Sequence, residues 1–196
     1  MTLYTAVITL ILVMDPLGNI PAFLSVLSHV ERRKRKRIIL RETSIAFVVL
    51  TVFLIFGQYI LEGTHISQSA LGISGGIILF LISLRMIFPH EESEARIRKP
   101  EDPFIVPLAI PLIAGPSTMA VVMLMAIHSP KHIPLWFLAL FISWLISTII
   151  LVFADKLSKL LGEKGLIALE RLMGMILTTM AVQMFLSGIQ QFFHLA

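Results

Sequence analysis

Long apolar stretches separated by short polar segments fill this chain of 196 residues. A helix needs roughly 20 apolar residues to cross a hydrocarbon core about 30 Å thick, and six stretches meet that requirement. They are Leu3–Val30, Thr43–Leu61, Ser69–Phe88, Phe104–Ile127, Ile133–Phe153 and Gly165–Phe193. Because little of the chain remains for a soluble domain, the pattern predicts an all-α polytopic membrane protein whose functional site lies within the membrane.

Two of these stretches are interrupted by the same pattern, P-L-x-x-x-P. Its copies run from Pro16 to Pro21 and from Pro111 to Pro116, 95 positions apart. Proline breaks the helical hydrogen-bond ladder, and hydrocarbon tolerates such a break only where it is buried in protein or lines a polar cavity. Interrupted helices at matching places in two halves are typical of the binding site of a transporter. We therefore expect the first and fourth helices to be interrupted.

The offset between the two motifs divides the chain into two halves of three spans each. The halves are residues 1–88 and 104–196, and the polar segment 89–103 connects them. Because three is an odd number, the second half is inverted relative to the first in the membrane. The pattern therefore predicts two inverted three-helix repeats joined by a solvated, cytoplasmic connector.

The basic residues are distributed very unevenly between the two sides of the predicted bundle. Of 16 lysines and arginines, 15 fall in or beside the three loops on one side. They are Arg32, Arg33, Lys34, Arg35, Lys36, Arg37, Arg41, Arg85, Arg96, Arg98, Lys99, Lys156, Lys159, Lys164 and Arg171. The positive-inside rule makes this side cytoplasmic and places both termini outside. The Glu31–Arg37 run is therefore expected to touch anionic lipid headgroups, and no nucleic-acid partner is expected.

Asp15 is the acidic residue of greatest interest. It lies about a dozen residues into the first span, or roughly 18 Å along a helix, where a carboxylate is costly and usually functional. No other acid in the predicted spans reaches this depth. A carboxyl group there can exchange a proton or help to hold Na⁺. An alternative interpretation is that Asp15-Pro16 is the N-cap and N1 pair that restarts a helix, and the two interpretations are compatible.

Further polar and small residues surround the two interruptions. Asn19 follows Asp15 by four positions, and its amide can both donate to and accept from a zwitterionic ligand. Gly18 and Gly115 allow close approach to the backbone. Ser117 and Thr118 occupy the equivalent place in the second half, either as ligand contacts or as helix caps. The exposed N–H groups of a restarted half-helix favour an anion such as a substrate carboxylate.

The remaining motifs indicate packing rather than catalysis. Gly72, Ser74, Gly75 and Gly76 form a patch of small residues typical of close helix–helix contact. The chain has no cysteine, and its histidines lack paired metal-ligand spacing. It also lacks the G-x-S-x-G nucleophile motif. We therefore expect no enzymatic activity, no metal and no cofactor.

Several longer motifs identify a family resemblance that covers the whole chain. The motifs are Met14–Phe23, Ile73–Phe80, Phe104–Ser117, Leu161–Gly165 and Glu170–Gly174. They resemble the MarC family, also called UPF0056, which includes proteins described as small neutral amino-acid transporters. The resemblance implies a multi-pass protein of the bacterial inner membrane, and its termini are then periplasmic.

The leading hypothesis is a secondary active transporter of small neutral amino acids of the alanine, glycine and serine class. Coupling to H⁺ or Na⁺ through Asp15 and alternating access around a midplane site are expected. A drug or metabolite exporter of the same architecture is the alternative, with Phe23 and Met119 beside its ligand. A non-transporting membrane scaffold or stress-response protein is the third. The expected partners are membrane lipid, the substrate and the cation; oligomeric state, substrate identity and direction of transport stay open.

Overall fold

The computed structural model describes residues 2–27, 30–88 and 113–193, and every regular element within these ranges is helical. The elements are α1 (Leu3–Met14), α2 (Ile20–Val26), α3 (Arg32–Thr64), α4 (Gln68–Ile87), α5 (Pro116–His128), the short 3₁₀ helix η3 (Pro130–His132), α6 (Ile133–Val152) and α7 (Ala154–Phe192). The all-α prediction is thus confirmed for the described residues, whereas the connector 89–103 and Pro111 lie outside them.

Four of the described helical segments are long and apolar enough to cross a membrane. They are Lys34–Thr64, Gln68–Ile87, Pro130–Val152 and Ala154–Phe192. The predicted first span instead contains two shorter helices, α1 and α2, separated by residues 15–19. The described part of the predicted fourth span contains the 13-residue helix α5. The sequence predicts six spans, and the described residues show four of spanning length.

The predicted second and sixth spans are too short at their N-terminal ends. Helix α3 begins at Arg32 rather than Thr43, and α7 begins at Ala154 rather than Gly165. The basic residues assigned to the first and third loops therefore lie within these helices. Hydropathy marks the part of a helix that matches the hydrocarbon, whereas a helix of 33 residues reaches about 50 Å, well beyond it. In α7 a kink at Gly162, with φ of 66°, separates the polar first turns from the apolar remainder.

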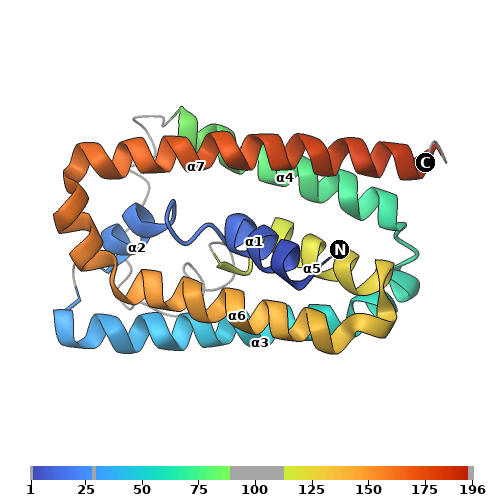
Figure 1. Cartoon of the computed structure of the whole chain (residues 1–196), viewed down its shortest axis with the longest axis horizontal. Helices are drawn as coiled ribbons and strands as arrows, with labels where there is room; N and C mark the ends of the chain where they lie inside the picture. Colours follow the sequence, from blue (N-terminus) through green and yellow to red (C-terminus); the bar gives the residue numbers. More distant parts are fainter. Residues whose placement is uncertain (1, 28–29, 89–112, 194–196) are drawn as a thin grey trace.

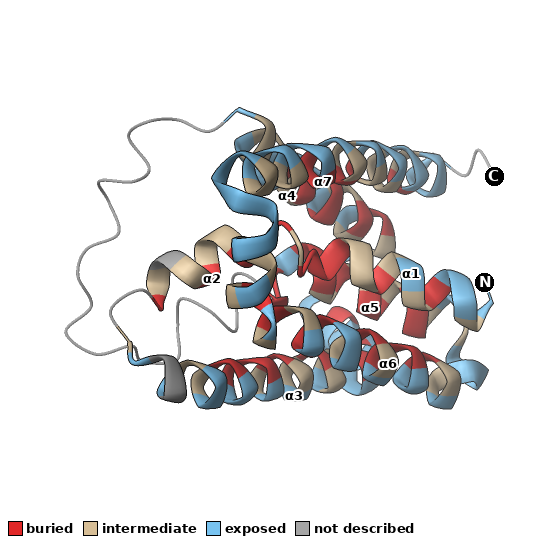
Figure 2. Cartoon of the chain, turned by 60° about the vertical axis from the view of Figure 1, so that its left-hand side comes forward, coloured by how far each residue is buried: buried red, intermediate tan, exposed pale blue. Residues whose placement is uncertain are grey.

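The helices form two antiparallel pairs with the short helices between them (Figure 1). Helices α3 and α6 make one pair, and α4 and α7 make the other. Helix α1 packs on α6, and α5 packs on both α3 and α4, so the short helices bridge the two pairs. Figure 2 shows the buried residues concentrated on the inward faces around α1 and α5. The two chain interruptions therefore lie in the interior of the bundle.

Small residues allow α4 and α7 to approach closely. A Cβ atom at Gly76 would lie only 2.9 Å from the carbonyl oxygen of Ala181 and 2.9 Å from the amide nitrogen of Phe185. A Cβ atom at Gly188 would lie 3.0 Å from the amide nitrogen of Ile73. Because these neighbours are backbone atoms, they cannot move aside as a flexible side chain would. The packing role predicted for the glycines of this patch is confirmed, although Ser74 itself is exposed.

The outer surface of the bundle is strongly apolar. Large hydrophobic side chains are exposed along the outward faces of α3 and α7, among them Val48, Val52, Phe56, Met175 and Val182. A soluble monomer rarely exposes so continuous an apolar surface. The same side chains are well placed against lipid, which agrees with a protein that is embedded in a membrane.

An ion pair joins the polar ends of α3 and α7. Nη1 of Arg35 donates to Oδ1 of Asp155 over 3.0 Å, and Nε of the same arginine donates to the Val30 carbonyl. The first and third basic segments of the sequence therefore lie at the same end of the molecule. Lys131, the basic residue predicted on the opposite side, lies in η3 at the other end of the α3–α6 pair (Figure 1).

Candidate functional site

The first interruption begins at Asp15, which ends α1. Asp15 adopts a left-handed conformation with φ of 42°, and its backbone N–H donates to the carbonyls of Ile11 and Leu12. Proline at position 16 disfavours a helical conformation for the preceding residue, so the helix cannot continue. The prediction that Asp15 and Pro16 form the N-cap and N1 pair of the next helix is wrong, because α2 begins at Ile20.

The side chain of Asp15 folds back over the turn that it starts. Its Oδ1 atom accepts a hydrogen bond of 3.0 Å from the backbone N–H of Gly18. The residue is 4% exposed, so the carboxylate is enclosed by protein. A Cβ atom at Gly18 would collide with Oδ2 of Asp15 and with the terminal methyl of Met86 on α4. Glycine at this position is therefore what allows the carboxylate to lie against the backbone.

Asn19 closes the same turn. Its backbone N–H donates to the Asp15 carbonyl over 3.1 Å, and its side-chain Nδ2 donates to the Met14 carbonyl over 3.0 Å. The second bond satisfies a carbonyl that the end of α1 leaves without a helical partner. The stretch from Asp15 to Asn19 is not helical. The two residues are linked by the turn itself.

The second interruption lies where α5 begins. Gly115 is the N-cap residue with extended φ and ψ, and Pro116 takes the first helical position, where its missing N–H is not needed. Ser117 and Thr118 follow in the first turn, and both are buried. Gly115 provides no side-chain cap, and neither hydroxyl serves as the N-cap. The backbone N–H groups of this first turn point out of the helix toward the interruption.

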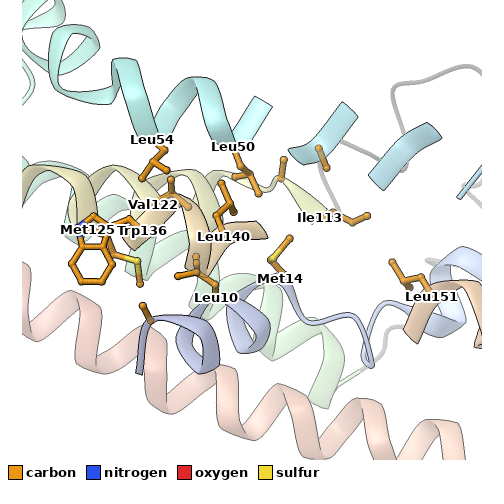
Figure 3. Packing of buried hydrophobic residues seen from close by; sticks show 14 of the residues in the cluster. Leu10, Met14, Leu50, Leu54, Ile113, Val122, Met125, Trp136, Leu140 and Leu151 are labelled. Carbon is orange, nitrogen blue, oxygen red and sulfur yellow. The ribbon is translucent and has the colours of Figure 1, made fainter. Parts of the chain in front are cut away.

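Residues beside both interruptions belong to one buried cluster. Met14, which precedes the first turn, and Ile113 and Ala114, which precede the second helix start, belong to the same hydrophobic core. Figure 3 shows Met14 and Ile113 within that group, next to Leu50 of α3 and Leu140 of α6. The described residues beside the two motifs, which the sequence places 95 residues apart, therefore share one hydrophobic core. Phe23, expected to line an apolar site, has no exposed surface and packs in this core instead.

A second acid, Glu42, is also buried in the bundle, at a position outside the predicted spans. Glu42 of α3 is 1% exposed, and its Oε1 atom accepts hydrogen bonds of 3.0 and 2.8 Å from Nε and Nη2 of Arg41. Glu42 escapes a hydropathy reading because it directly precedes the apolar run that starts at Thr43.

The described residues contain no group of three or more histidine, cysteine, aspartate or glutamate side chains arranged to hold a metal ion. The described parts of the two motifs thus supply a carboxylate, an amide, two hydroxyl groups and the backbone groups at the end of α1 and the start of α5. This set can bind a small polar molecule by hydrogen bonds and charge.

Comparison with known proteins assigns the family. Residues 1–193 match the description "MarC family integral membrane protein". The chain belongs to the MarC family. Among its relatives, the "UPF0056 inner membrane protein YhgN" of Escherichia coli (strain K12) is 48% identical over 187 residues, which cover 95% of each chain.

Other MarC family relatives extend the similarity to more distant bacteria. A "UPF0056 membrane protein" of Buchnera aphidicola subsp. Baizongia pistaciae is 48% identical over 191 residues, covering 96% of each chain. A counterpart in Chlamydia pneumoniae is 34% identical over 182 residues, covering 92% of this chain and 90% of its own. No solved structure matches the chain. The family assignment establishes an integral membrane protein, and the resemblance stated from the motifs is confirmed.

Proposed function

We propose that this MarC family protein is a secondary active transporter of small neutral amino acids, coupled to H⁺ or Na⁺. The observation that carries the proposal is that Asp15 is buried in the break after α1, and that the residues flanking this break and the start of α5 share one hydrophobic core. Such interruptions lie at the substrate and ion sites of membrane carriers, because unwound backbone supplies polar groups where hydrocarbon otherwise has none.

The groups at the two interruptions complement an amino-acid zwitterion. The free N–H groups of the first turn of α5 favour a carboxylate, and Pro116 at the first position leaves those of Ser117 and Thr118 for it. Asp15 offers a carboxylate oxygen to an ammonium group or to the coupling cation. Gly18 leaves no room for a side chain beside the Asp15 carboxylate, and such tight surroundings suit substrates the size of alanine, glycine or serine.

The arrangement of the helices supports the two inverted repeats that alternating access requires. Under the offset of 95, α2 corresponds to α5, α3 to α6 and α4 to α7. The contacts agree with this correspondence: α3 packs on α6, α4 packs on α7, and the α4–α5 contact has its counterpart between α2 and α7. In the proposed cycle one repeat rocks against the other and exposes the covered Asp15 to each side in turn.

Uptake by purified protein in sealed vesicles tests the proposal. Labelled alanine, glycine and serine are supplied outside, with no gradient, with an inward H⁺ gradient and with an inward Na⁺ gradient. The proposal requires that one gradient drives accumulation above equilibrium and that unlabelled alanine competes. If folded protein moves none of these substrates under any gradient, the proposal fails. The exporter of larger or more apolar ligands then becomes the leading hypothesis.

A further inference from the structure

Buried polar atoms that make no hydrogen bond within the described residues occur on both α3 and α6. One of these atoms belongs to Glu42, whose Oε1 atom is held by Arg41. The other oxygen, Oε2, is buried and makes no hydrogen bond within the described residues. An unpartnered buried carboxylate oxygen is costly, because the protein has removed it from water without replacing the lost interactions.

Two hydroxyl groups on α6 are likewise buried without a hydrogen-bond partner among the described residues. They are Oγ of Ser147 and Oγ1 of Thr148. Helical serine and threonine usually bond back to the preceding turn, as Ser143 does to the Ala139 carbonyl and Thr178 to the Gly174 carbonyl. Ser147 and Thr148 depart from that pattern although a carbonyl of the preceding turn is available to each.

A hydrogen bond between α3 and α6 indicates that Glu42 lies at about the same position along the helix axes as Ser147 and Thr148. Nε1 of Trp144 donates to the Thr43 carbonyl over 2.8 Å. Glu42 is the neighbour of Thr43 on α3, and Ser147 and Thr148 follow Trp144 by about one turn of α6. Since the helices are antiparallel, that turn continues α6 toward the end of α3 on which Glu42 lies.

The buried face of α3 that carries Glu42 packs in the same hydrophobic core as the residues before α5. Glu42 lies between Ile39 and Ala46 on the buried face of α3, and both belong to the same core as Ile113 and Ala114. The segment before α5 is therefore close enough to the Glu42 face to share one core with it. In membrane carriers the carbonyls of such irregular segments often help to coordinate a cation.

We propose that Glu42 Oε2, with the hydroxyl oxygens of Ser147 and Thr148, forms a binding site for a small hard monovalent cation, Na⁺. Oxygen atoms are the ligands that hard cations prefer, and all three groups present oxygen lone pairs. A single carboxylate that already shares its charge with Arg41 suits a monovalent rather than a divalent ion. The role of this Na⁺ as the coupling ion of the carrier rests on the proposed function. In that role, Na⁺ binds at Glu42 and Asp15 binds the ammonium group of the substrate.

The binding itself is tested without transport, by thermal unfolding of the purified protein at constant ionic strength in mixtures of NaCl and choline chloride. The midpoint is expected to rise with Na⁺ and to saturate, and KCl is expected to have a much smaller effect. Replacing Glu42→Gln or Ser147→Ala should raise the half-saturating Na⁺ concentration roughly tenfold or more.

Two matched controls should keep the wild-type Na⁺ response. Thr51→Ala removes a buried hydroxyl of α3 that makes no hydrogen bond among the described residues but lies more than two turns from Glu42. Glu163→Gln removes an exposed acid from α7. If Glu42→Gln does not fold, Ser147→Ala and Thr148→Val carry the test.

Three results overturn the site: no Na⁺ effect, an equal effect of K⁺, or the same response in every variant. Amino-acid uptake driven by H⁺ alone, with no Na⁺ binding, would contradict the Na⁺ site and support the proposed transporter function. Na⁺ binding without any amino-acid uptake would support the Na⁺ site and contradict the proposed transporter function.

Discussion

Thr178 of α7 donates a hydrogen bond of 2.8 Å to the hydroxyl of Ser83 on α4, and the two residues are 95 positions apart. The same offset separates Pro16 from Pro111 and Pro21 from Pro116. Residues related by a two-fold axis touch each other only where they lie on that axis. The pair therefore marks the place where the axis of the proposed inverted repeat would cross the α4–α7 contact.

This pair predicts measurable coupling between α4 and α7. In a double-mutant cycle, Ser83→Ala and Thr178→Val should be non-additive in the free energy of unfolding by about 0.6 kcal/mol, the usual size for hydrogen bonds between membrane helices. The single hydroxyl proton of Thr178 is shared between Ser83 and the Gly174 carbonyl, so the cycle measures the Ser83 contact net of that competing bond. The control cycle pairs Ser83→Ala with Thr179→Val, whose hydroxyl is exposed and bonds within α7. Equal coupling in both cycles would contradict the assignment.

A methyl group at position 18 is predicted to displace the Asp15 carboxylate. Gly18→Ala places a Cβ atom against Oδ2 of Asp15 and against Met86, so we expect a loss of about 1–3 kcal/mol in stability and a marked loss of uptake. The control is Gly63→Ala, at a position in α3 with no atom within 4 Å of the added Cβ. Uptake by the control should match the wild type, and its stability should be equal or slightly higher because alanine favours a helix more than glycine does. Wild-type uptake by folded Gly18→Ala would show that the carboxylate need not lie there.

Asn19→Ala is predicted to loosen the first interruption. The change leaves the buried Met14 carbonyl without its side-chain donor, which should cost about 1–3 kcal/mol in thermal unfolding experiments. Gln183→Ala removes an amide that bonds Ser187 on the exposed face of α7, and it should cost less than about 0.5 kcal/mol. If the two variants unfold at the same temperature, the Asn19 contact contributes little to the turn.

The orientation of the chain can be read directly because the protein has no cysteine. An impermeant maleimide added to intact cells is expected to label Thr2→Cys and Lys131→Cys. It should reach Lys34→Cys and Lys159→Cys only after the membrane is permeabilised, because the basic segments are predicted to be cytoplasmic. All four positions are exposed in the structure. The reverse labelling pattern would invert the topology.

Hydropathy predicts the bounds of a helix well where its apolar run ends at a turn. The predicted spans Ser69–Phe88 and Ile133–Phe153 differ from α4 and α6 by one residue at most at either end. The starts of α3 and α7 are missed because charged residues continue a helix beyond the hydrocarbon, where water and headgroups solvate them. Glu42 is missed for the same reason, since it lies in that extension and only the packed bundle shows it to be buried.

The turn at Asp15 shows that the local sequence indicates where the next helix starts. A helix starting at Pro16 would place Pro21 in its interior, where the missing N–H would break a hydrogen bond. A helix starting at Ile20 places Pro21 in its first turn, where no N–H is needed. Pro116 likewise takes the first position of α5. The second proline of each motif thus marks the helix start, whereas the burial of both segments in one core depends on packing that the local sequence does not encode.

The most direct test of the central claim compares uptake by the wild type with uptake by Asp15→Asn in the same sealed vesicles. The variant keeps the shape of the side chain and an oxygen for the Gly18 N–H, so folded protein is expected. Glu163→Gln, which alters an exposed acid, is the control. The account predicts that Asp15→Asn reduces gradient-driven alanine accumulation roughly tenfold to a hundredfold, while the control accumulates alanine normally. Full accumulation by folded Asp15→Asn would contradict the account.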